Sequence, residues 1–489
     1  MSGHRTARVL VYTHRWLGIV SGVLFVVWFA SGIVMMYARM PELDPAERLA
    51  RLPAINPASI RVAPALSGEG EIARLTVGTL EGRPIYRVTS RGKAQLSFAD
   101  TGEAIPIVDV EQALRIARGF DGGSHELRYD ARLIDADQWS FGVRGRMPLH
   151  RISVVDAAGT MLYVTETGGE VVLKTTSSGR LWGGAGAVLH WLYFTPFRRN
   201  ASLWGQTIIW LSIAGTLMCI VGIMWGLWRV APFRGYRLRN HRQWSPYAGW
   251  MRWHHYAGLI FGLVTTTWIF SGLLSMDPWD WHPSTSPTRE QRQRVAGGPI
   301  DVNDLTVARL QTVVHAFAPD LPKEVEIVRF RGRYYASAKA GIVSFDQPQF
   351  GARDQLPADL LMGAATLAMD GVPIDGESWL DGYDSYYYDR EGRLSLPVLR
   401  VRYDDPQHTW LYFDPKHGTI ARKEERLTRL NRWLYHGFHS LDFPFLYYRR
   451  PLWDIVVILL SIGGIVLSAT TLTASWRRVR RTVISASRS

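Results

Sequence analysis

The chain of 489 residues contains a single cysteine, Cys219. One cysteine cannot form a disulfide within the chain, ligate an iron–sulfur cluster by thiolates, or supply the C-x-x-C-H motif of covalent haem attachment. The sequence also lacks G-x-G-x-x-G and other nucleotide-binding motifs, so direct reduction by a nucleotide cofactor bound to this chain is not predicted. Any redox group must therefore be held by non-covalent ligation.

Acidic residues are absent from three segments that are rich in arginine: the N-terminal tail, the link over residues 229–252, and the C-terminal tail. Their arginines are Arg5, Arg8, Arg15, Arg229, Arg234, Arg237, Arg239, Arg242, Arg252, Arg477, Arg478, Arg480, Arg481 and Arg488. By the positive-inside rule all three segments are expected in the cytoplasm. The net charge of +13 is then a topology signal, and nucleic acid is not predicted as a partner.

Four apolar runs are long enough to cross a hydrocarbon core of about 30 Å, which needs about 20 helical residues. They lie near residues 11–37, 204–228, 253–276 and 452–475. The first run is too long for a secretory signal and lacks a cleavage pattern, so we expect a retained anchor. These runs predict an integral protein of the bacterial inner membrane, surrounded by lipid, with cytoplasmic termini and two long loops in the periplasm.

The first and third runs carry one repeated pattern at an offset of 240 residues. His14, Gly18, Gly22, Trp28, Ser31 and Gly32 correspond to His254, Gly258, Gly262, Trp268, Ser271 and Gly272. Most of these positions share one helix face, because a helix advances about 100° per residue. Such a face leaves room for a broad, flat group held through imidazole, and haem is the obvious candidate. Close helix packing without a cofactor explains the glycines equally well, but not the histidines.

A second repeat, at an offset of 249 residues, surrounds the second and fourth runs. Its matched pairs include Tyr163 and Tyr412, Arg180 and Arg429, His190 and His439, Trp204 and Trp453, and Gly215 and Gly464. His190 and His439 precede their spans by about fourteen residues, and prolines break the chain between, so each is expected on a short helix at the membrane boundary. Both halves cross the membrane in the same direction, which predicts parallel repeats and a pseudo-two-fold axis along the membrane normal.

This symmetry predicts how the histidines pair. Equivalent residues near the axis can bind one group from opposite sides, so we expect His14 with His254 and His190 with His439. Pairing within a half would require ligands at opposite faces of the bilayer to meet. Gly18, Gly22, Gly258 and Gly262 are expected to line the first site. His255 and His436 stay open as alternative ligands, because neighbouring histidines cannot be separated from sequence. Two imidazoles leave iron no open position, which favours electron transfer, and no catalytic side chain is predicted.

The two external segments have α+β patterns. In the first we expect strands near 84–89, 96–98, 126–133, 139–143 and 161–165 and a helix near 110–118. In the second we expect helices near 306–317 and 357–368, strands near 325–338 and 398–403, and a hairpin over 410–422. We predict one small sheet-and-helix domain per half. The expected transmembrane segments, the second and fourth with a preceding interfacial helix, are 1–40, 181–230, 253–276 and 429–476. The expected external domains are 41–180 and 277–428, and the basic cytoplasmic segments are 231–252 and 477–489.

The segment 411–420, LYFDPKHGTI, followed by Arg429 and a histidine before a span, resembles the PepSY domain with its associated transmembrane helices. So does the opening HRWLG at 14–18. The resemblance covers nearly the whole chain in two copies. The first copy departs from it, with TET at 165–167 where the second has DPK at 414–416, so the two external domains need not share a role.

The resemblance implies an inner-membrane cytochrome with two haem b groups that reduces a ferric siderophore or another periplasmic acceptor. Its electrons would come from a cytoplasmic donor or from quinol. Two alternatives remain: a haem-free PepSY protein that binds or regulates a partner, and a cytochrome that serves another periplasmic enzyme. A transporter is disfavoured because the spans hold only Ser, Thr and Cys219 as polar groups near mid-bilayer.

Overall fold

The computed structural model describes residues 2–66, 70–90, 93–238 and 241–486, and the chain divides into two compact units. The first unit comprises Met1–Met40, Ser178–His282 and Leu430–Ser489, and the second comprises Pro41–Ser177 and Pro283–Arg429. Two arginines of the predicted cytoplasmic segments, Arg239 and Arg488, lie outside the described residues.

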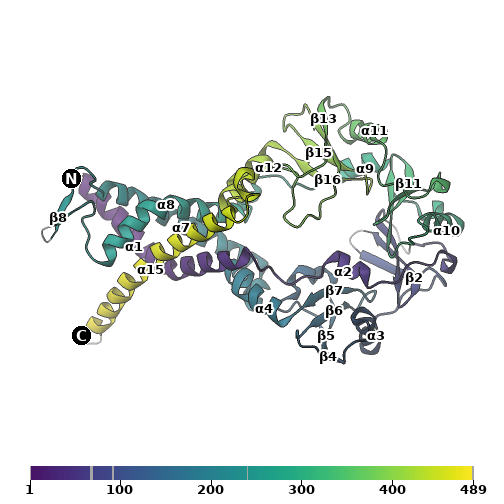
Figure 1. Ribbon diagram of the computed structural model, residues 1–489, viewed down its shortest axis with the longest axis horizontal. Helices are drawn as coiled ribbons and strands as arrows, with labels where there is room; N and C mark the ends of the chain where they lie inside the picture. The colour runs from purple at the N-terminus through teal and green to yellow at the C-terminus, as the bar shows by residue number, and fades with distance from the viewer. Residues whose placement is uncertain (1, 67–69, 91–92, 239–240, 487–489) are drawn as a thin grey trace. The chain divides into compact units, whose positions relative to one another are not determined.

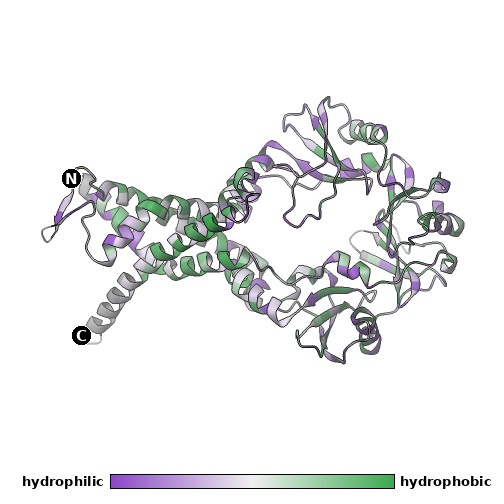
Figure 2. Ribbon diagram, viewed as in Figure 1, coloured by the Kyte–Doolittle hydropathy of each residue, from purple (hydrophilic) through white to green (hydrophobic). Residues whose placement is uncertain are grey.

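Four long helices make up most of the first unit: α1 (Ser2–Met35), α7 (Ala201–Arg229), α8 (Trp250–Leu274) and α15 (Leu452–Ala486). The stretches long and apolar enough to cross a membrane are Arg5–Met35, Ala201–Arg229, Trp250–Leu274 and Leu452–Thr473. The four predicted spans are thereby confirmed as helices of sufficient length and apolarity. Figure 2 shows the apolar residues running along these helices. Many face outward, as at Val20, Ile260 and Leu263, which is typical of a lipid-facing surface.

The four helices pack in a ring in which α1 contacts α7 and α15, and α8 contacts the same two helices (Figure 1). The repeat relates α1 to α8 and α7 to α15, so the contacts of one half correspond to those of the other. Helices α1 and α8 lie diagonally opposite each other in the ring. Phe25, Phe29 and Trp268 fill the centre of the bundle. A Cβ at Gly215 would lie 2.9 Å from the Phe25 ring, and one at Gly464 2.6 Å from the Phe29 ring. Glycine is therefore needed at both repeat positions to admit these rings.

Each half also carries a short interrupted helix that bears the predicted histidine. In the first half this is α4 (Ser177–Gly183), the π-helix η3 (Gly184–Val188) and α5 (Leu189–Trp191), and in the second it is α12 (Arg426–Asn431), the π-helix η7 (Arg432–Gly437) and α13 (Phe438–Ser440). Leu192 and Leu441 end these helices in the left-handed region, with φ of 52° and 49°. The next helices, α6 (Thr195–Arg198) and α14 (Pro444–Tyr447), each have proline in their first turn. Between the halves, β8 (Tyr236–Leu238) and β9 (His241–Gln243) form a hairpin.

The second unit contains a six-stranded antiparallel sheet with the order β12-β11-β10-β1-β2-β3. Its strands are β1 (Ile72–Leu80), β2 (Arg83–Ser90), β3 (Lys93–Phe98), β10 (Val325–Phe330), β11 (Arg333–Ala338) and β12 (Gly341–Ser344). Strands β1 and β10 pair across the middle, with Leu75 opposite Ile327. The two halves therefore share a sheet, which differs from the prediction of one self-contained domain per half. Pairing removes the open edge that each three-stranded sheet would otherwise expose.

Two further sheets have four antiparallel strands each, one sheet per half. They consist of β4 (Leu127–Leu133), β5 (Leu149–Val154), β6 (Met161–Thr165) and β7 (Val171–Thr175), and of β13 (Ile374–Leu380), β14 (Val398–Tyr403), β15 (Trp410–Asp414) and β16 (Thr419–Glu424). Helix α3 (Val110–Asp121) packs on the first sheet and α11 (Ala358–Ala368) on the second, while α10 (Val307–His315) belongs to the core of the six-stranded sheet. The three predicted helices of the external segments are thus present. Shorter helices are α2 (Pro45–Ala50), α9 (Arg289–Ala296), η1 (Pro57–Ser59), η2 (Ser140–Arg146), η4 (Pro278–Asp280), η5 (Val302–Asp304) and η6 (Pro348–Phe350).

The strand predicted near residues 139–143 is wrong, because this segment enters the 3₁₀ helix η2. The Asp137 carboxylate accepts hydrogen bonds from the backbone N–H groups of Trp139 and Ser140, both at 3.0 Å. Such bonds from an aspartate to the backbone two and three residues on favour a tight turn over an extended strand. The apolar alternation of this segment is therefore overridden by the residue that precedes it.

Candidate cofactor-binding site

Two histidines from diagonal helices, His14 of α1 and His254 of α8, form the first histidine pair. Their ring centres lie 5.9 Å apart. Nδ1 of His14 lies 3.0 Å from the backbone carbonyl oxygen of Met218 on α7, and Nδ1 of His254 lies 3.3 Å from that of Leu467 on α15. Met218 and Leu467 are equivalent positions of the 249-residue repeat. Both halves therefore share this carbonyl contact, and in the second half the Thr470 hydroxyl also lies 3.1 Å from Nδ1 of His254.

His190 of α5 and His439 of α13 form the second histidine pair, with ring centres 6.1 Å apart. Nδ1 of His190 lies 3.1 Å from the carbonyl oxygen of Trp28, and Nδ1 of His439 lies 3.2 Å from that of Trp268. The hydroxyls of Ser31 and Ser271 approach the same two nitrogens, each at 3.1 Å. Residues of the 240-residue repeat thus hold the histidines of the 249-residue repeat. Each histidine follows a π-helix, a feature found often at functional sites.

The carbonyl contacts fix which ring nitrogen carries the proton. A carbonyl oxygen only accepts, so Nδ1 is protonated and Nε2 keeps its lone pair, as in metal-binding histidines held by an outer hydrogen bond. In the described part of the chain, Nε2 of His14, His190 and His254 has no hydrogen-bond partner. Burial, reinforced by the neighbouring His439, lowers the pKa of His190 to about 4. This ring is therefore neutral near pH 7, which is the form that binds metal.

The separation of the rings in both pairs fits one metal ion between two imidazoles. A bond from a first-row metal to an imidazole nitrogen is about 2.0–2.1 Å, and that nitrogen lies about 1.1 Å from its ring centre, which places two facing rings about 6.2–6.4 Å apart. The observed separations are 5.9 and 6.1 Å. Among the described residues no group of three or more His, Cys, Asp or Glu side chains could hold a metal ion.

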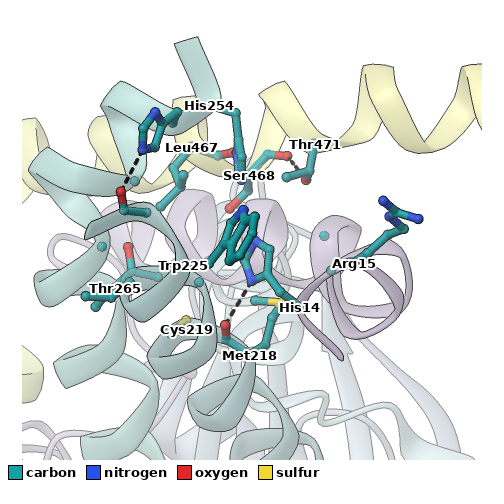
Figure 3. Close-up of a pocket in the computed structure, with 18 of the residues that line it drawn as sticks. His14, Arg15, Met218, Cys219, Trp225, His254, Thr265, Leu467, Ser468 and Thr471 are labelled. Atoms are coloured by element: carbon teal, nitrogen blue, oxygen red, sulfur yellow. Dashed lines mark hydrogen bonds between the residues drawn. The ribbon is translucent and has the colours of Figure 1, made fainter. Parts of the chain in front are cut away.

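A cavity of about 620 Å³ surrounds the first histidine pair. Figure 3 shows His14, Met218 and Trp225 among the side chains that line it, with the hydrogen bond from His14 to the Met218 carbonyl dashed. The lining is mostly apolar and comes from all four long helices, and it includes Gly18, Gly22, Gly258 and Gly262. Its volume and apolar walls fit a small-molecule or cofactor site. The four glycines predicted to line the first site are therefore on its wall.

The glycines make room in two ways. A Cβ at Gly18 or Gly258 would meet its nearest neighbour at 3.7 or 3.8 Å, so an added methyl group would mainly fill cavity space. A Cβ at Gly22 or Gly262 would lie 3.2 Å from an atom of a neighbouring helix, so these two also permit close helix packing. Both interpretations of the sequence pattern therefore apply, each to one pair of glycines.

The alternative ligands lie differently. His255 is buried, and both of its ring nitrogens have partners: Nδ1 lies 2.8 Å from the Ser245 hydroxyl, and Nε2 lies 2.9 Å from the Gly226 carbonyl oxygen. Both ring nitrogens of His255 therefore already have hydrogen-bond partners, whereas the ring of His254 lies next to that of His14. His436 packs on Tyr435, with ring centres 4.4 Å apart, while His439 faces His190. The geometry favours His254 and His439 as the ligands.

Three features of the site were not predicted. The carbonyl oxygens of Met218 and Leu467 carry no side-chain signal, although their positions follow from the repeat offset. Gly222 packs directly against the His14 ring, and its repeat counterpart is Thr471, so no repeated glycine marks it. Ser31 and Ser271 belong to the 240-residue repeat, but their hydrogen bonds with His190 and His439 were not predicted.

No family model matches the chain, and no curated protein sequence matches it.

Proposed function

We propose that this chain is a di-haem b-type cytochrome of the bacterial inner membrane that carries electrons from the cytoplasmic side to a periplasmic acceptor. Two histidine pairs support this proposal best. Each pair joins the two halves of the chain, and the distance between its ring centres is suited to one iron. In every pair Nδ1 contacts a backbone carbonyl from an equivalent repeat position. A purely structural histidine has no need of such matched orientation.

The residues of the chain have separate tasks in this function. His14 and His254 bind one haem, and His190 and His439 bind the other. Each haem, when bound, supplies reversible one-electron transfer at its iron. The carbonyls of Met218, Leu467, Trp28 and Trp268 hold the imidazoles in the ligating tautomer. Two histidines would hold the iron at each pair, which favours electron transfer over binding of oxygen or substrate at the metal.

The direction of transfer follows from the arginine distribution. The segments around the first pair are rich in arginine and lack Asp and Glu, which supports a cytoplasmic location for that pair and for both termini. The second pair then lies on the periplasmic side of the membrane. This pair is therefore the exit point, and the first pair accepts electrons from a cytoplasmic donor or from quinol.

A ferric siderophore is the proposed acceptor. The resemblance to PepSY membrane proteins favours it, and so does iron chemistry: hard oxygen chelators hold ferric iron far better than ferrous iron, which ranks low in the affinity order of divalent metals. One-electron reduction of the chelate therefore releases the metal. No general acid, general base or nucleophile is required of the chain.

The first test counts haems in the purified full-length protein by visible absorption and pyridine haemochrome. We expect two per chain, and one in each of His14→Ala, His254→Ala, His190→Ala and His439→Ala. His315→Ala, an exposed residue of α10, is the matched control and should retain both. A colourless protein made with ample haem supply would favour the haem-free PepSY alternative. A ligand variant that kept both haems would refute that residue's assignment.

The acceptor is tested separately by stopped-flow oxidation of the reduced protein. We expect ferric chelates with hard oxygen ligands to reoxidise both haems, and His190→Ala to slow this step strongly. If ferric chelates leave the haems reduced while a periplasmic extract reoxidises them, the chain serves another periplasmic enzyme instead.

A further inference from the structure

The charged side chains that line the cavity at the first histidine pair are all of one sign. Arg15 and Arg229 line it together with histidines, and no Asp or Glu is among its lining residues. The other walls are apolar or carry neutral polar groups. Unpaired guanidinium groups at an apolar cavity are costly to desolvate, so the arrangement favours an occupant that is apolar over most of its surface and negatively charged at an edge.

One end of this cavity holds two hydrogen-bond donors, on Arg229 and Tyr247, that have no acceptor among the described residues. Arg229 ends α7, and its Nε is buried with no hydrogen-bond partner in the described part of the chain. Its guanidinium stacks on Trp225 at 5.6 Å. Trp225 in turn donates from Nε1 to the Tyr247 hydroxyl oxygen at 2.8 Å. The hydroxyl therefore accepts from Trp225, and its own hydrogen is left to be donated. In the described part of the chain neither donor has an acceptor, and a carboxylate supplies one.

The neighbouring loop holds Tyr247 in this position. The Gln243 side-chain amide donates to the backbone carbonyls of Ser245 and Tyr247, at 2.7 and 2.8 Å. Nδ1 of His255 lies 2.8 Å from the Ser245 hydroxyl, and Arg252 donates a hydrogen bond to the Gln243 side-chain oxygen at 3.1 Å. Arg252 is thus already engaged, unlike Arg229. The burial of His255 is explained by this task, since it fixes the loop that carries Tyr247.

Arg229 and Tyr247 lie at a distance from the first histidine pair that matches the edge of a group centred between His14 and His254. Arg229 lies seven residues beyond Gly222, the glycine that packs on the His14 ring. Seven residues of α-helix extend about 10 Å. Haem b is an apolar disc with two carboxylates on one edge. We propose that Arg229 and Tyr247 bind the carboxylates of the haem at the first pair, with Arg15 as the second cation. This inference rests on the proposed function.

Charge-assisted hydrogen bonds from arginine to a carboxylate are shorter and stronger than neutral ones, and a guanidinium can bind both oxygens at once. Arg229 and Tyr247 therefore orient the haem as well as retain it. They also set its reduction potential, because a cation beside the carboxylates offsets negative charge that would oppose adding an electron to the iron.

The test compares Arg229→Gln and Tyr247→Phe with two controls in the full-length protein. Arg229→Lys keeps the charge, and Arg234→Gln removes one charge from an exposed arginine of the same segment. The readouts are haems per chain, the midpoint potential of each haem, and the rate at which haem transfers to an apo-globin. Infrared difference spectra on reduction, with haem labelled with ¹³C at its carboxylates, report the carboxylate environment directly.

In Arg229→Gln we expect one midpoint to fall while the other stays, about tenfold faster transfer of one haem, and a shift of the labelled carboxylate bands. Tyr247→Phe should shift the same bands less, Arg229→Lys should restore the midpoint largely, and Arg234→Gln should match the wild type. The outcome is specific to the first pair if the midpoint that falls is the one that His14→Ala loses.

Unchanged midpoints and carboxylate bands in Arg229→Gln, in a protein that holds two haems, would overturn this inference and leave the proposed function standing. Loss of a co-purifying anionic phospholipid from that variant, with both midpoints unmoved, would also overturn it, since a lipid phosphate would then be the anion at Arg229. A wild type without haem would instead refute the proposed function itself.

Discussion

Gly222 of α7 lies against the imidazole of His14 on α1, so that a Cβ at position 222 would stand 2.5 Å from Cε1 and 2.7 Å from Nδ1 of that ring. Both distances are too short for a contact with a Cβ atom. The atoms contacted belong to the rigid imidazole ring, so a small movement of a flexible side-chain end cannot relieve the clash. The absence of a side chain at 222 is therefore what lets His14 reach both the Met218 carbonyl and the face of His254.

Gly222→Ala is predicted to displace the His14 ring and to loosen one haem while leaving the other in place. Alanine is the better helix former by about 1 kcal/mol, so α7 itself should not be weakened. The matched control is Gly205→Ala in the same helix, where a Cβ would have no neighbour within 4 Å. Haems per chain and the low-temperature absorption spectrum are the measurements. Equal haem content in the two variants would contradict the assigned role of Gly222.

Ser31→Ala with Ser271→Ala is predicted to affect only the second histidine pair. Each hydroxyl is one of two acceptors near the histidine Nδ1, and the Trp28 and Trp268 carbonyls remain. A hydrogen bond of this kind contributes about 1 kcal/mol, so haem at the second pair should dissociate roughly five- to tenfold faster.

Ser275→Ala is the control for this pair, because the one partner of its hydroxyl among the described residues is the Gly272 carbonyl, at 2.6 Å. Haem transfer rates, resolved by the two midpoints, measure the effect. If the haem at the first pair were lost faster instead, the serines would act through helix packing rather than through the histidines.

The repeat made the candidate site predictable from sequence. Residues related by the offsets of 240 and 249 must occupy related places, and this alone brought His14 to His254 and His190 to His439. The choice between His254 and His255 could not be made in this way, because it depends on Ser245 and Gly226, which occupy the ring nitrogens of His255. Ser245 comes from the single link between the halves, which has no repeat counterpart, and Gly226 lies near the end of α7.

The second unit was less predictable, for a different physical reason. Alternating apolar residues indicate a strand but not its partner, so the pairing of Leu75 with Ile327, 252 positions apart, is invisible locally. Strand β1 also buries three consecutive residues, Leu75, Thr76 and Val77, which conceals the alternation. The segment predicted as a strand near residues 139–143 enters the helix η2, because the Asp137 carboxylate accepts hydrogen bonds from the backbone N–H groups of Trp139 and Ser140.

Glu170→Gln is predicted to destabilise the second unit by about 2–3 kcal/mol, because it removes the anion shared by three arginines. Glu170 is only 12% exposed and lies 3.2 Å from Arg87, 3.1 Å from Arg146 and 3.4 Å from Arg48. Arg48 also pairs with Glu324 of the second half at 2.9 Å, so the cluster joins the halves. Thermal unfolding of the full-length protein, followed by tryptophan fluorescence, measures the loss. Glu111→Gln, at an exposed pair with Arg115, should change the unfolding temperature little.

Acid should remove the same contribution in the wild type. Burial opposes ionisation of Glu170, but Arg87, Arg146 and Arg48 outweigh it and lower its pKa. A carboxylate whose pKa is lower in the folded state stabilises the fold above its unfolded pKa of about 4.3 and loses this effect as the pH falls through the folded value. Glu170→Gln should therefore unfold at a more nearly constant temperature between pH 5 and 3 than the wild type. A parallel acid response in both proteins would mean that other carboxylates control it.

The hairpin of β15 and β16 should show the opposite pH response through His417, whose Nδ1 lies 2.6 Å from the Asp414 carboxylate. The hydrogen bond with Asp414 raises the pKa of His417 against the smaller effect of burial. A histidine whose pKa is raised on folding stabilises the fold fully below its unfolded pKa of about 6.5, and the effect disappears as the pH rises through the folded value. The His417 side chain is 52% exposed, so solvent limits the gain to below about 1 kcal/mol. His417→Gln should accordingly lower the unfolding temperature at pH 5.5 and leave it unchanged at pH 9. A deficit of equal size at both pH values would show that His417 contributes through packing, since the protonated ring is the only form that depends on the Asp414 charge.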